Sequence, residues 1–200
     1  MLSAIDELRR AHQRVFLPDE SALLILDMQE YFLAEPSHAY IPSATAIIPG
    51  IIELCNDYRA KGLPIIFTQH VNSSQDAMLM ATWWRDVIRP EDPRSAIIPE
   101  FRRDGAITIK KSQYDAFYRT ELEALLKARE VKQLVICGVM AQLCCETTAR
   151  SAFVRGFEVF FTVDGTATYN ERFHRATLLN LAHGVATPVL IEEIRAALER

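Results

Sequence analysis

Short, almost purely apolar segments alternate with helical segments along most of this 200-residue chain. Segments of this kind, rich in Val, Ile, Leu and Phe, are typical of strands that are buried on both faces of a sheet. Because helical segments fall between them, the alternation predicts an α/β fold with a mainly parallel sheet and helices on both faces. Five strands are predicted at 22–27, 64–68, 106–110, 134–138 and 158–163, and a weaker sixth at 187–191.

The helical segments have recognisable first and last residues. Proline is favoured at the first position of a helix, and the spacing Thr-x-x-Glu is typical of a capping box. These signals predict helix starts at Pro49, at Thr120 with Glu123, and at Thr168 with Glu171. Two more helices are expected at 144–155 and from 192 onward, whereas 72–99 is expected to be an irregular excursion over the edge of the sheet.

Size and charge exclude several classes of protein. Two hundred residues, half of them apolar, fit one folded domain over 1–200. The net charge is −4 and the basic residues are scattered, so neither nucleic acid nor a membrane is an expected partner. The N-terminal segment is charged and does not resemble a secretory signal. The four cysteines lack zinc or disulfide spacing, so free thiols and a cytoplasmic location are expected.

Three reactive side chains are predicted at the carboxyl edge of the sheet, where open α/β sheets bind ligands. Asp27 ends the first strand, Lys110 and Lys111 end the third, and Cys144 begins the helix after the fourth. An ammonium and a helix N-terminus would lower the pKa of the thiol, and the carboxylate could accept its proton. From spacing alone, each residue could equally be structural, as a turn cap, a surface lysine or a packed cysteine.

Three motifs in this chain resemble those of the isochorismatase-like hydrolase superfamily. The segments are ALLILDMQEYF, KSQYDAFYRTEL and CGVMAQLCCETTARSAF, and their order and spacing agree over about 14–193. The resemblance implies a Rossmann-like, three-layer α/β fold with a six-stranded, mainly parallel sheet. It also implies that Asp27, Lys111 rather than Lys110, and Cys144 are the catalytic residues.

Two further features of the site follow from the same resemblance. The family has a cis peptide bond after the glycine of the third motif, which corresponds to Val139 and Met140 here. The backbone N–H groups of Met140 and Cys144 would then bind an oxyanion. Cys145 occupies a position that is expected to be structural.

Departures from two branches of the superfamily narrow the expected chemistry. Enzymes that cleave isochorismate carry glycine, tyrosine and glutamine where this chain has Cys144, Met140 and His70. Nicotinamidases bind a metal through Asp-x-His where this chain has His70 and Asn72, which make a poor divalent site. The resemblance therefore implies a hydrolase without metal or cofactor that cleaves an amide, carbamoyl or ureido C–N bond through a thioester. Nicotinamide is not expected as the main substrate.

Two other functions stay open at this point. One is an isochorismatase, which forms 2,3-dihydro-2,3-dihydroxybenzoate and pyruvate, and the other is a non-catalytic interaction module on the same fold. A small molecule is the expected ligand, and a homo-oligomer, dimer or tetramer, is the expected assembly. Trp83 and Trp84 fit either a lid or a subunit interface. Candidate substrate contacts are Gln29, His70, Gln142, Trp84 and Arg85.

Overall fold

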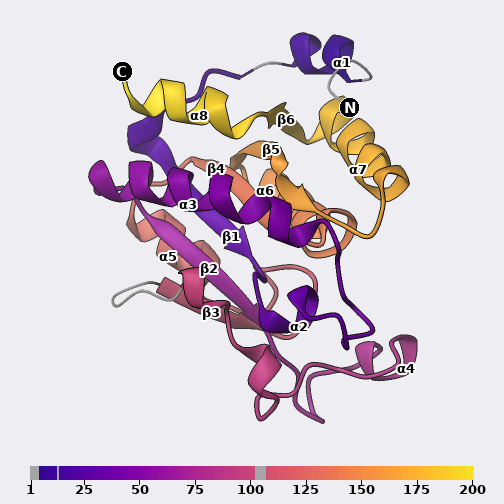
Figure 1. Ribbon diagram of the computed structural model, residues 1–200. Coiled ribbons are helices and arrows are strands. Elements are labelled where there is room, and N and C mark those ends of the chain that lie inside the picture. The colour runs from indigo at the N-terminus through magenta and orange to yellow at the C-terminus, as the bar shows by residue number, and fades with distance from the viewer. Residues whose placement is uncertain (1–4, 13, 102–106) are drawn as a thin grey trace.

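Six parallel strands form one sheet in the order β3-β2-β1-β4-β5-β6 (Figure 1). The computed structural model describes residues 5–12, 14–101 and 107–200. The strand order reverses between β1 and β4, which creates the crevice where α/β sheets bind ligands. The strands are β1 (Ser21–Leu26), β2 (Ile65–His70), β3 (Ile107–Lys111), β4 (Gln133–Val139), β5 (Glu158–Ala167) and β6 (Ala186–Val189).

Helices cover both faces of this sheet and enclose two apolar cores. Alternate residues of β1 point to opposite faces, with Leu23 and Ile25 in one core and Leu24 and Leu26 in the other. The first core is closed by α3 (Ala44–Ala60) and α8 (Ile191–Leu198), which pack side by side (Figure 1). The second core is closed by α1 (Asp6–Ala11), α5 (Leu122–Ala128), α6 (Glu146–Val154) and α7 (Glu171–Gly184). The α/β fold with a six-stranded sheet, predicted from the alternation of segments, is thus confirmed.

Short elements cover the carboxyl edge of the sheet, in the lower part of Figure 1. They are α2 (Glu30–Leu33), α4 (Met80–Trp83) and the 3-10 turns Pro93–Ser95 and Pro99–Phe101; another such turn, Pro18–Glu20, precedes β1. The segment 72–99 is irregular apart from α4, the turn Pro93–Ser95 and the first residue of the turn Pro99–Phe101, as the sequence indicated. Within the described residues, no helix is long and apolar enough to cross a bilayer.

Pro49 does not begin a helix, contrary to the prediction. It lies inside α3, which begins at Ala44. Ala44 and Ile47 are buried against the sheet, and their packing extends the helix before the proline. Tertiary burial here outweighs the local preference of proline for the first turn.

The two predicted capping boxes are also absent. The Thr120 hydroxyl donates to the carbonyl of Ala116 and accepts from Leu122 N–H. The Glu123 side chain pairs with Lys127 and Arg155 instead of turning back to Thr120, so no capping box forms. Asn170, not Thr168, caps α7, because its side chain accepts a hydrogen bond from Phe173 N–H. The Thr168 hydroxyl is used elsewhere and donates to the side chain of Gln142.

Gly138 allows β4 to approach β1 closely just before the site. Its φ is 109°, and an added Cβ would lie 2.1 Å from the carbonyl oxygen of Leu26. The β4–β5 register also shifts between Ile136 and Gly138. Only glycine fits this combination of backbone conformation and close contact.

We expect Gly138→Ala to lower the free energy of unfolding by about 3 kcal/mol or more, because backbone strain and a steric clash add. Gly156→Ala is the matched control: φ is 88° there, but nothing lies within 4 Å of an added Cβ. That variant should lose only about 1–2 kcal/mol. Urea denaturation measures both; equal losses would show that the contact with Leu26 does not matter.

Candidate active site

Asp27 follows β1 directly and has a left-handed backbone, with a φ of 52°. The strain of this conformation is about 1–3 kcal/mol, and Asp tolerates it better than most residues. The Thr68 hydroxyl holds the turn: it accepts a hydrogen bond from Asp27 N–H (3.1 Å) and donates one to Asp27 Oδ1 (2.6 Å). Oδ1 is therefore occupied, and Oδ2 is the oxygen that faces the other reactive groups.

Lys111 ends β3 and is completely buried beside Asp27. Its Nζ lies 2.7 Å from Asp27 Oδ2, and both side chains are 0% exposed. It also donates to the Gln113 carbonyl at 3.0 Å and to Cys144 Sγ at 3.2 Å. Oδ2 accepts no well-aligned hydrogen bond from the described residues, so the contact with Nζ is chiefly an ion pair. Lys110 is exposed, as alternation along a strand requires.

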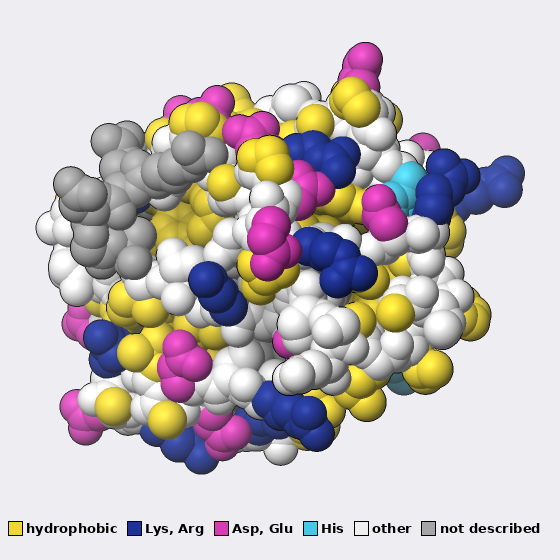
Figure 2. Space-filling view, turned by 90° about the horizontal axis from the view of Figure 1, so that it is seen from below, with side chains coloured by type: hydrophobic (Ala, Val, Ile, Leu, Met, Phe, Trp, Pro, Cys, Tyr) yellow, Lys and Arg dark blue, Asp and Glu magenta, His cyan; other side chains and the backbone are white. Residues whose placement is uncertain are grey.

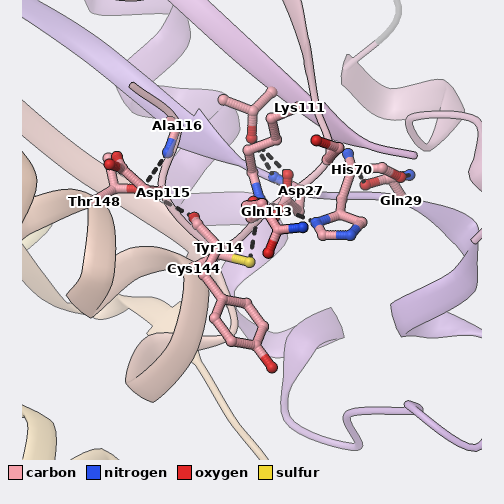
Figure 3. A network of polar contacts seen from close by, with 12 residues as sticks. Asp27, Gln29, His70, Lys111, Gln113, Tyr114, Asp115, Ala116, Cys144 and Thr148 are labelled. Carbon is pink, nitrogen blue, oxygen red and sulfur yellow. Dashed lines mark hydrogen bonds and ion pairs between the residues drawn. The ribbon is translucent and has the colours of Figure 1, made fainter. Parts of the chain in front are cut away.

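Cys144 reaches the same point from the turn after β4. This turn, Ala141–Cys145, is π-helical and continues into α6, so the helical segment begins three residues before the predicted start at 144. Figure 3 shows the side chains of Asp27, Lys111 and Cys144 pointing toward one another. The Val139–Met140 peptide bond before the turn is cis. Cys145 is fully buried in the second core.

The charges of the cluster depend on the ion pair. Burial would raise the pKa of Asp27 and lower the pKa of Lys111, but each charge stabilises the other. The pKa of Asp27 is accordingly below its ordinary value and that of Lys111 above it. At neutral pH the pair is a carboxylate and an ammonium.

Cys144 is a neutral thiol in the resting site, which corrects the expected thiolate. Burial and the Asp27 carboxylate raise its pKa to about 12, and Lys111 offsets only part of this. A thiolate would stand beside the existing carboxylate, and one ammonium cannot stabilise two buried anions equally well. A neutral thiol needs a base before it can act as a nucleophile, and Asp27 Oδ2 is the adjacent one.

Cys144 borders an open pocket of about 500 Å³, its mouth included. The pocket walls are mostly aromatic and apolar, which is typical of small-molecule sites. Its ring-bearing wall residues include Tyr31, Phe32, Trp84, Tyr114 and Tyr169, and its polar ones are His38, His70, Asn72 and Asp86. Within the described residues, no Lys or Arg lines it.

The five candidate substrate contacts fall into two groups. His70 and Trp84 line the pocket, and the Trp84 indole N–H donates to the Tyr114 hydroxyl at 2.8 Å. Gln29 is fully buried and bonds to backbone atoms of His70 and Ser95.

Gln142 and Arg85 do not line the pocket either. Gln142 pairs with Thr168, and Arg85 is exposed on the surface. Figure 2 shows acidic and basic side chains interspersed on the face seen from below, without a large area of one sign.

Sequence reasoning missed Thr68 and the pocket residues Tyr31 and Tyr169. Thr68 follows Phe67, which pairs with Ile25 of β1. A parallel pairing of the two predicted strands in this register would have placed Thr68 beside the end of β1 and so close to Asp27. Tyr31 lies inside the first motif and Tyr169 lies 16 residues after the third, and only the tertiary structure shows that both line one pocket.

A metal ion does not fit this cluster. Asp27, His70 and Cys144 are of ligating types, and their ligand atoms lie within 4.8 Å of one another. However, Lys111 Nζ lies among them, 2.7, 3.3 and 3.2 Å from Asp27 Oδ2, His70 Nδ1 and Cys144 Sγ. A cation would have to displace a buried, paired ammonium.

Comparison with known proteins assigns the chain to a family. A family model described as "Isochorismatase domain" matches residues 21–193, and the chain belongs to this family. It is 38% identical over 185 residues to Nicotinamidase 3 of Arabidopsis thaliana, covering 89% of this chain and 88% of that protein. Identity to enterobactin synthase component B of Escherichia coli (strain K12) is 30% over 185 residues, covering 91% of this chain and 65% of that protein.

A solved structure shares the fold. The cysteine hydrolase from Pseudomonas syringae pv. phaseolicola 1448A superposes with a TM-score of 0.86 at 22% identity, covering 94% of this chain and 96% of that one. This likeness extends over nearly the whole chain and shows that the two proteins share a fold.

We expect iodoacetamide to label Cys144 first, because it borders the pocket while the other three cysteines are at most 1% exposed. Its labelling rate should rise from pH 7 to 10 without a plateau, since its pKa is raised to about 12. Asp27→Asn removes the carboxylate that raises this pKa, so labelling at pH 7 should become about tenfold faster for each unit of decrease.

Peptide mass spectrometry identifies the labelled cysteine, and Cys145→Ala is the control that should not alter the rate. A plateau already present at pH 7 would mean that Cys144 rests as a thiolate.

Proposed function

We propose that the protein is a hydrolase that cleaves a C–N bond of a small amide, carbamoyl or ureido compound, with Cys144 as the nucleophile. The observation that carries this proposal is the buried contact of a carboxylate, an ammonium and a thiol beside an aromatic pocket. A base next to a nucleophile, with a third group that orients the base, is the usual arrangement for covalent catalysis.

In the proposed reaction, Asp27 Oδ2 takes the thiol proton as Cys144 Sγ attacks the carbonyl carbon of the substrate. The N–H groups of Met140 and Cys144 stabilise the negative oxygen that develops. Asp27 then gives its proton to the leaving nitrogen, the C–N bond breaks, and an acyl thioester remains. A water molecule attacks the thioester while Asp27 takes its proton. The C–S bond breaks and the proton returns to sulfur, so the net change is the hydrolysis of one C–N bond.

Lys111 supplies a fixed positive charge throughout this sequence. It keeps Asp27 ionised before the attack and offsets the negative charge that passes between oxygen and sulfur. Thr68 holds Oδ1, so proton transfer occurs at Oδ2.

The pocket favours an uncharged, flat substrate. Aromatic walls suit a planar group, and Asp86 is the only charged side chain among the described lining residues. Isochorismate carries two carboxylates, and this lining offers neither Lys nor Arg to bind them. The family membership keeps isochorismate cleavage as the second candidate. Similarity to a protein named as a nicotinamidase makes nicotinamide a necessary test compound, although His70 and Asn72 led us to expect another main substrate.

We expect ammonia release from some members of a panel of nicotinamide, benzamide, simple ureides and N-carbamoyl amino acids. Neutral amides should react faster than matched carboxylate-bearing analogues, such as 4-carboxybenzamide beside benzamide. Cys144→Ala should reduce the rate by about 10³-fold or more, whereas Cys145→Ala should keep most of it. Activity should survive exhaustive chelation.

Two outcomes of this assay would contradict the proposal. Pyruvate release from isochorismate without ammonia release from any amide would establish the second candidate. Loss of amidase activity on chelation, restored by zinc or iron, would show that a metal takes part.

We expect Lys111→Ala to lower kcat by about 10²–10⁴-fold, because Asp27 loses the charge that keeps it ionised. Lys110→Ala, at the exposed neighbouring position, should change kcat little. Circular dichroism of both purified variants checks that the fold survives. The reverse pattern would mean that the wrong lysine has been assigned.

A homo-oligomer remains a prediction. Trp83 in α4 and Leu79 just before this helix are each 79% exposed. Large apolar side chains that are this exposed are often covered by a partner subunit.

A further inference from the structure

His70 and Asn72 form a polar chain behind Lys111 that the proposed reaction does not use directly. His70 Nδ1 lies 3.3 Å from Lys111 Nζ, and His70 Nε2 lies 3.0 Å from Asn72 Oδ1. Asn72 Nδ2 in turn donates to the carbonyl of Ser112 at 2.8 Å. The side chains involved are almost fully buried, with exposed fractions of 6% for His70 and 1% for Asn72.

The hydrogen-bonding groups at the two ends of this chain determine its direction. A carbonyl can only accept, so the Asn72 atom that faces Ser112 must be the amide nitrogen, and Oδ1 must face His70. Asn72 Oδ1 can only accept, so the proton of His70 is on Nε2. A neutral imidazole has one N–H, and Nδ1 is then an acceptor that faces an ammonium, which can only donate.

We propose that His70 is a positioning residue for the proposed reaction: as a neutral Nε2–H tautomer selected by Asn72, it accepts a hydrogen bond from Lys111 and anchors the ammonium between Asp27 and Cys144. This inference rests on the proposed function for its kinetic consequences, but not for the tautomer itself. Both ring nitrogens of His70 are engaged within the protein, so they are not available to bind a substrate.

The surroundings of His70 keep it neutral. The titratable groups that face it are Lys111 from β3, Asp27 from the end of β1, Cys144 from the turn after β4, and Asp76 from the 72–99 segment. Burial and the Lys111 ammonium lower the pKa of His70 to about 4, against the opposing effect of the two carboxylates. An imidazolium at this position would repel Lys111 and could not accept its proton.

The anchor matters because the ammonium has more acceptors than protons. Lys111 Nζ has three N–H groups, and its neighbours include Asp27 Oδ2, Cys144 Sγ, the Gln113 carbonyl and His70 Nδ1. Hydrogen bonds to His70 Nδ1 and to the Gln113 carbonyl hold Lys111 Nζ in place. The position of the positive charge then stays constant while the proton moves between sulfur and Oδ2.

The tautomer is tested directly on the wild-type protein, without any substrate. A long-range proton–nitrogen correlation spectrum distinguishes protonated from unprotonated ring nitrogens, and His70→Asn identifies the His70 signals by their loss. We expect Nε2 protonated and Nδ1 unprotonated from pH 8 down to about pH 5. A proton on Nδ1, or on both nitrogens, at pH 7 would overturn the proposal even if amidase activity were found.

The kinetic test compares two substitutions of the same residue. In His70→Asn the side-chain Oδ1 stands near the former Nδ1 and can still accept from Lys111, whereas in His70→Leu nothing can. We expect His70→Leu to lower kcat by about 10–100-fold with little change in KM, and His70→Asn to recover most of that loss. A change in KM alone, or equal losses in both variants, would identify a substrate contact or a packing residue instead.

A pH profile provides the second kinetic test. Asn72→Asp places a carboxylate against Nε2 and should raise the pKa of His70, so kcat should fall at low pH and recover as the imidazolium deprotonates. Gln75→Glu adds the same charge to the same segment as Asn72, at an exposed position. This control variant should not show the loss of kcat at low pH. The same loss in both variants would mean that the added negative charge alone, and not the protonation of His70, lowers kcat.

If wild-type protein hydrolyses no amide, the proposed function fails, and the spectrum still decides the His70 assignment.

Discussion

The ion pair between Asp27 and Lys111 is the interaction on which the rest of the site depends. Both side chains are completely removed from solvent, and burying two charges costs several kcal/mol per ion before their attraction offsets it. Such a pair is weak evidence for stability, because apolar residues of similar volume often do as well. Its position beside a pocket and a thiol instead suggests a chemical role: it supplies a carboxylate that is ionised without water.

The fold brings the two charges together at the place where the strand order reverses. Asp27 leaves β1 in a left-handed conformation, and Gly138 lets β4 approach the Leu26 carbonyl just before it. These two local constraints bring the turn of Cys144 beside the carboxylate, while β3 delivers Lys111 from two strands away. Thr68 stabilises Asp27 in this strained conformation, because its hydroxyl hydrogen-bonds to both the N–H and the carboxylate of Asp27. Thr68 therefore fixes the position of this carboxylate, and Lys111 keeps it ionised.

The sequence predicted those parts of the molecule that depend on pattern and order along the chain. Continuous apolar segments indicated where the strands are. Asp27 and Lys111 at strand ends, and Cys144 shortly after a third strand, were therefore expected at the same edge of the sheet. The charge of Cys144 was predicted wrongly, because neighbouring cations and a helix start are visible in a sequence, whereas burial beside a carboxylate is not. The helix caps failed for a related reason: Thr168 and Thr120 have the right spacing, but the folded chain offers each hydroxyl a different partner.

The charge count of the cluster explains why a neutral histidine suits this site better than a metal. At rest, one carboxylate and one ammonium cancel, and the thiol and imidazole are uncharged. Transfer of the thiol proton to Asp27 changes which atom is negative but leaves the total at zero. A second cation, whether an imidazolium or a bound metal, would add a buried positive charge, and the carboxylates that face His70 offset only part of its cost. Since isolated buried charges are far more costly than paired ones, the cluster is balanced for a single mobile proton, and His70 contributes by accepting a hydrogen bond without adding charge.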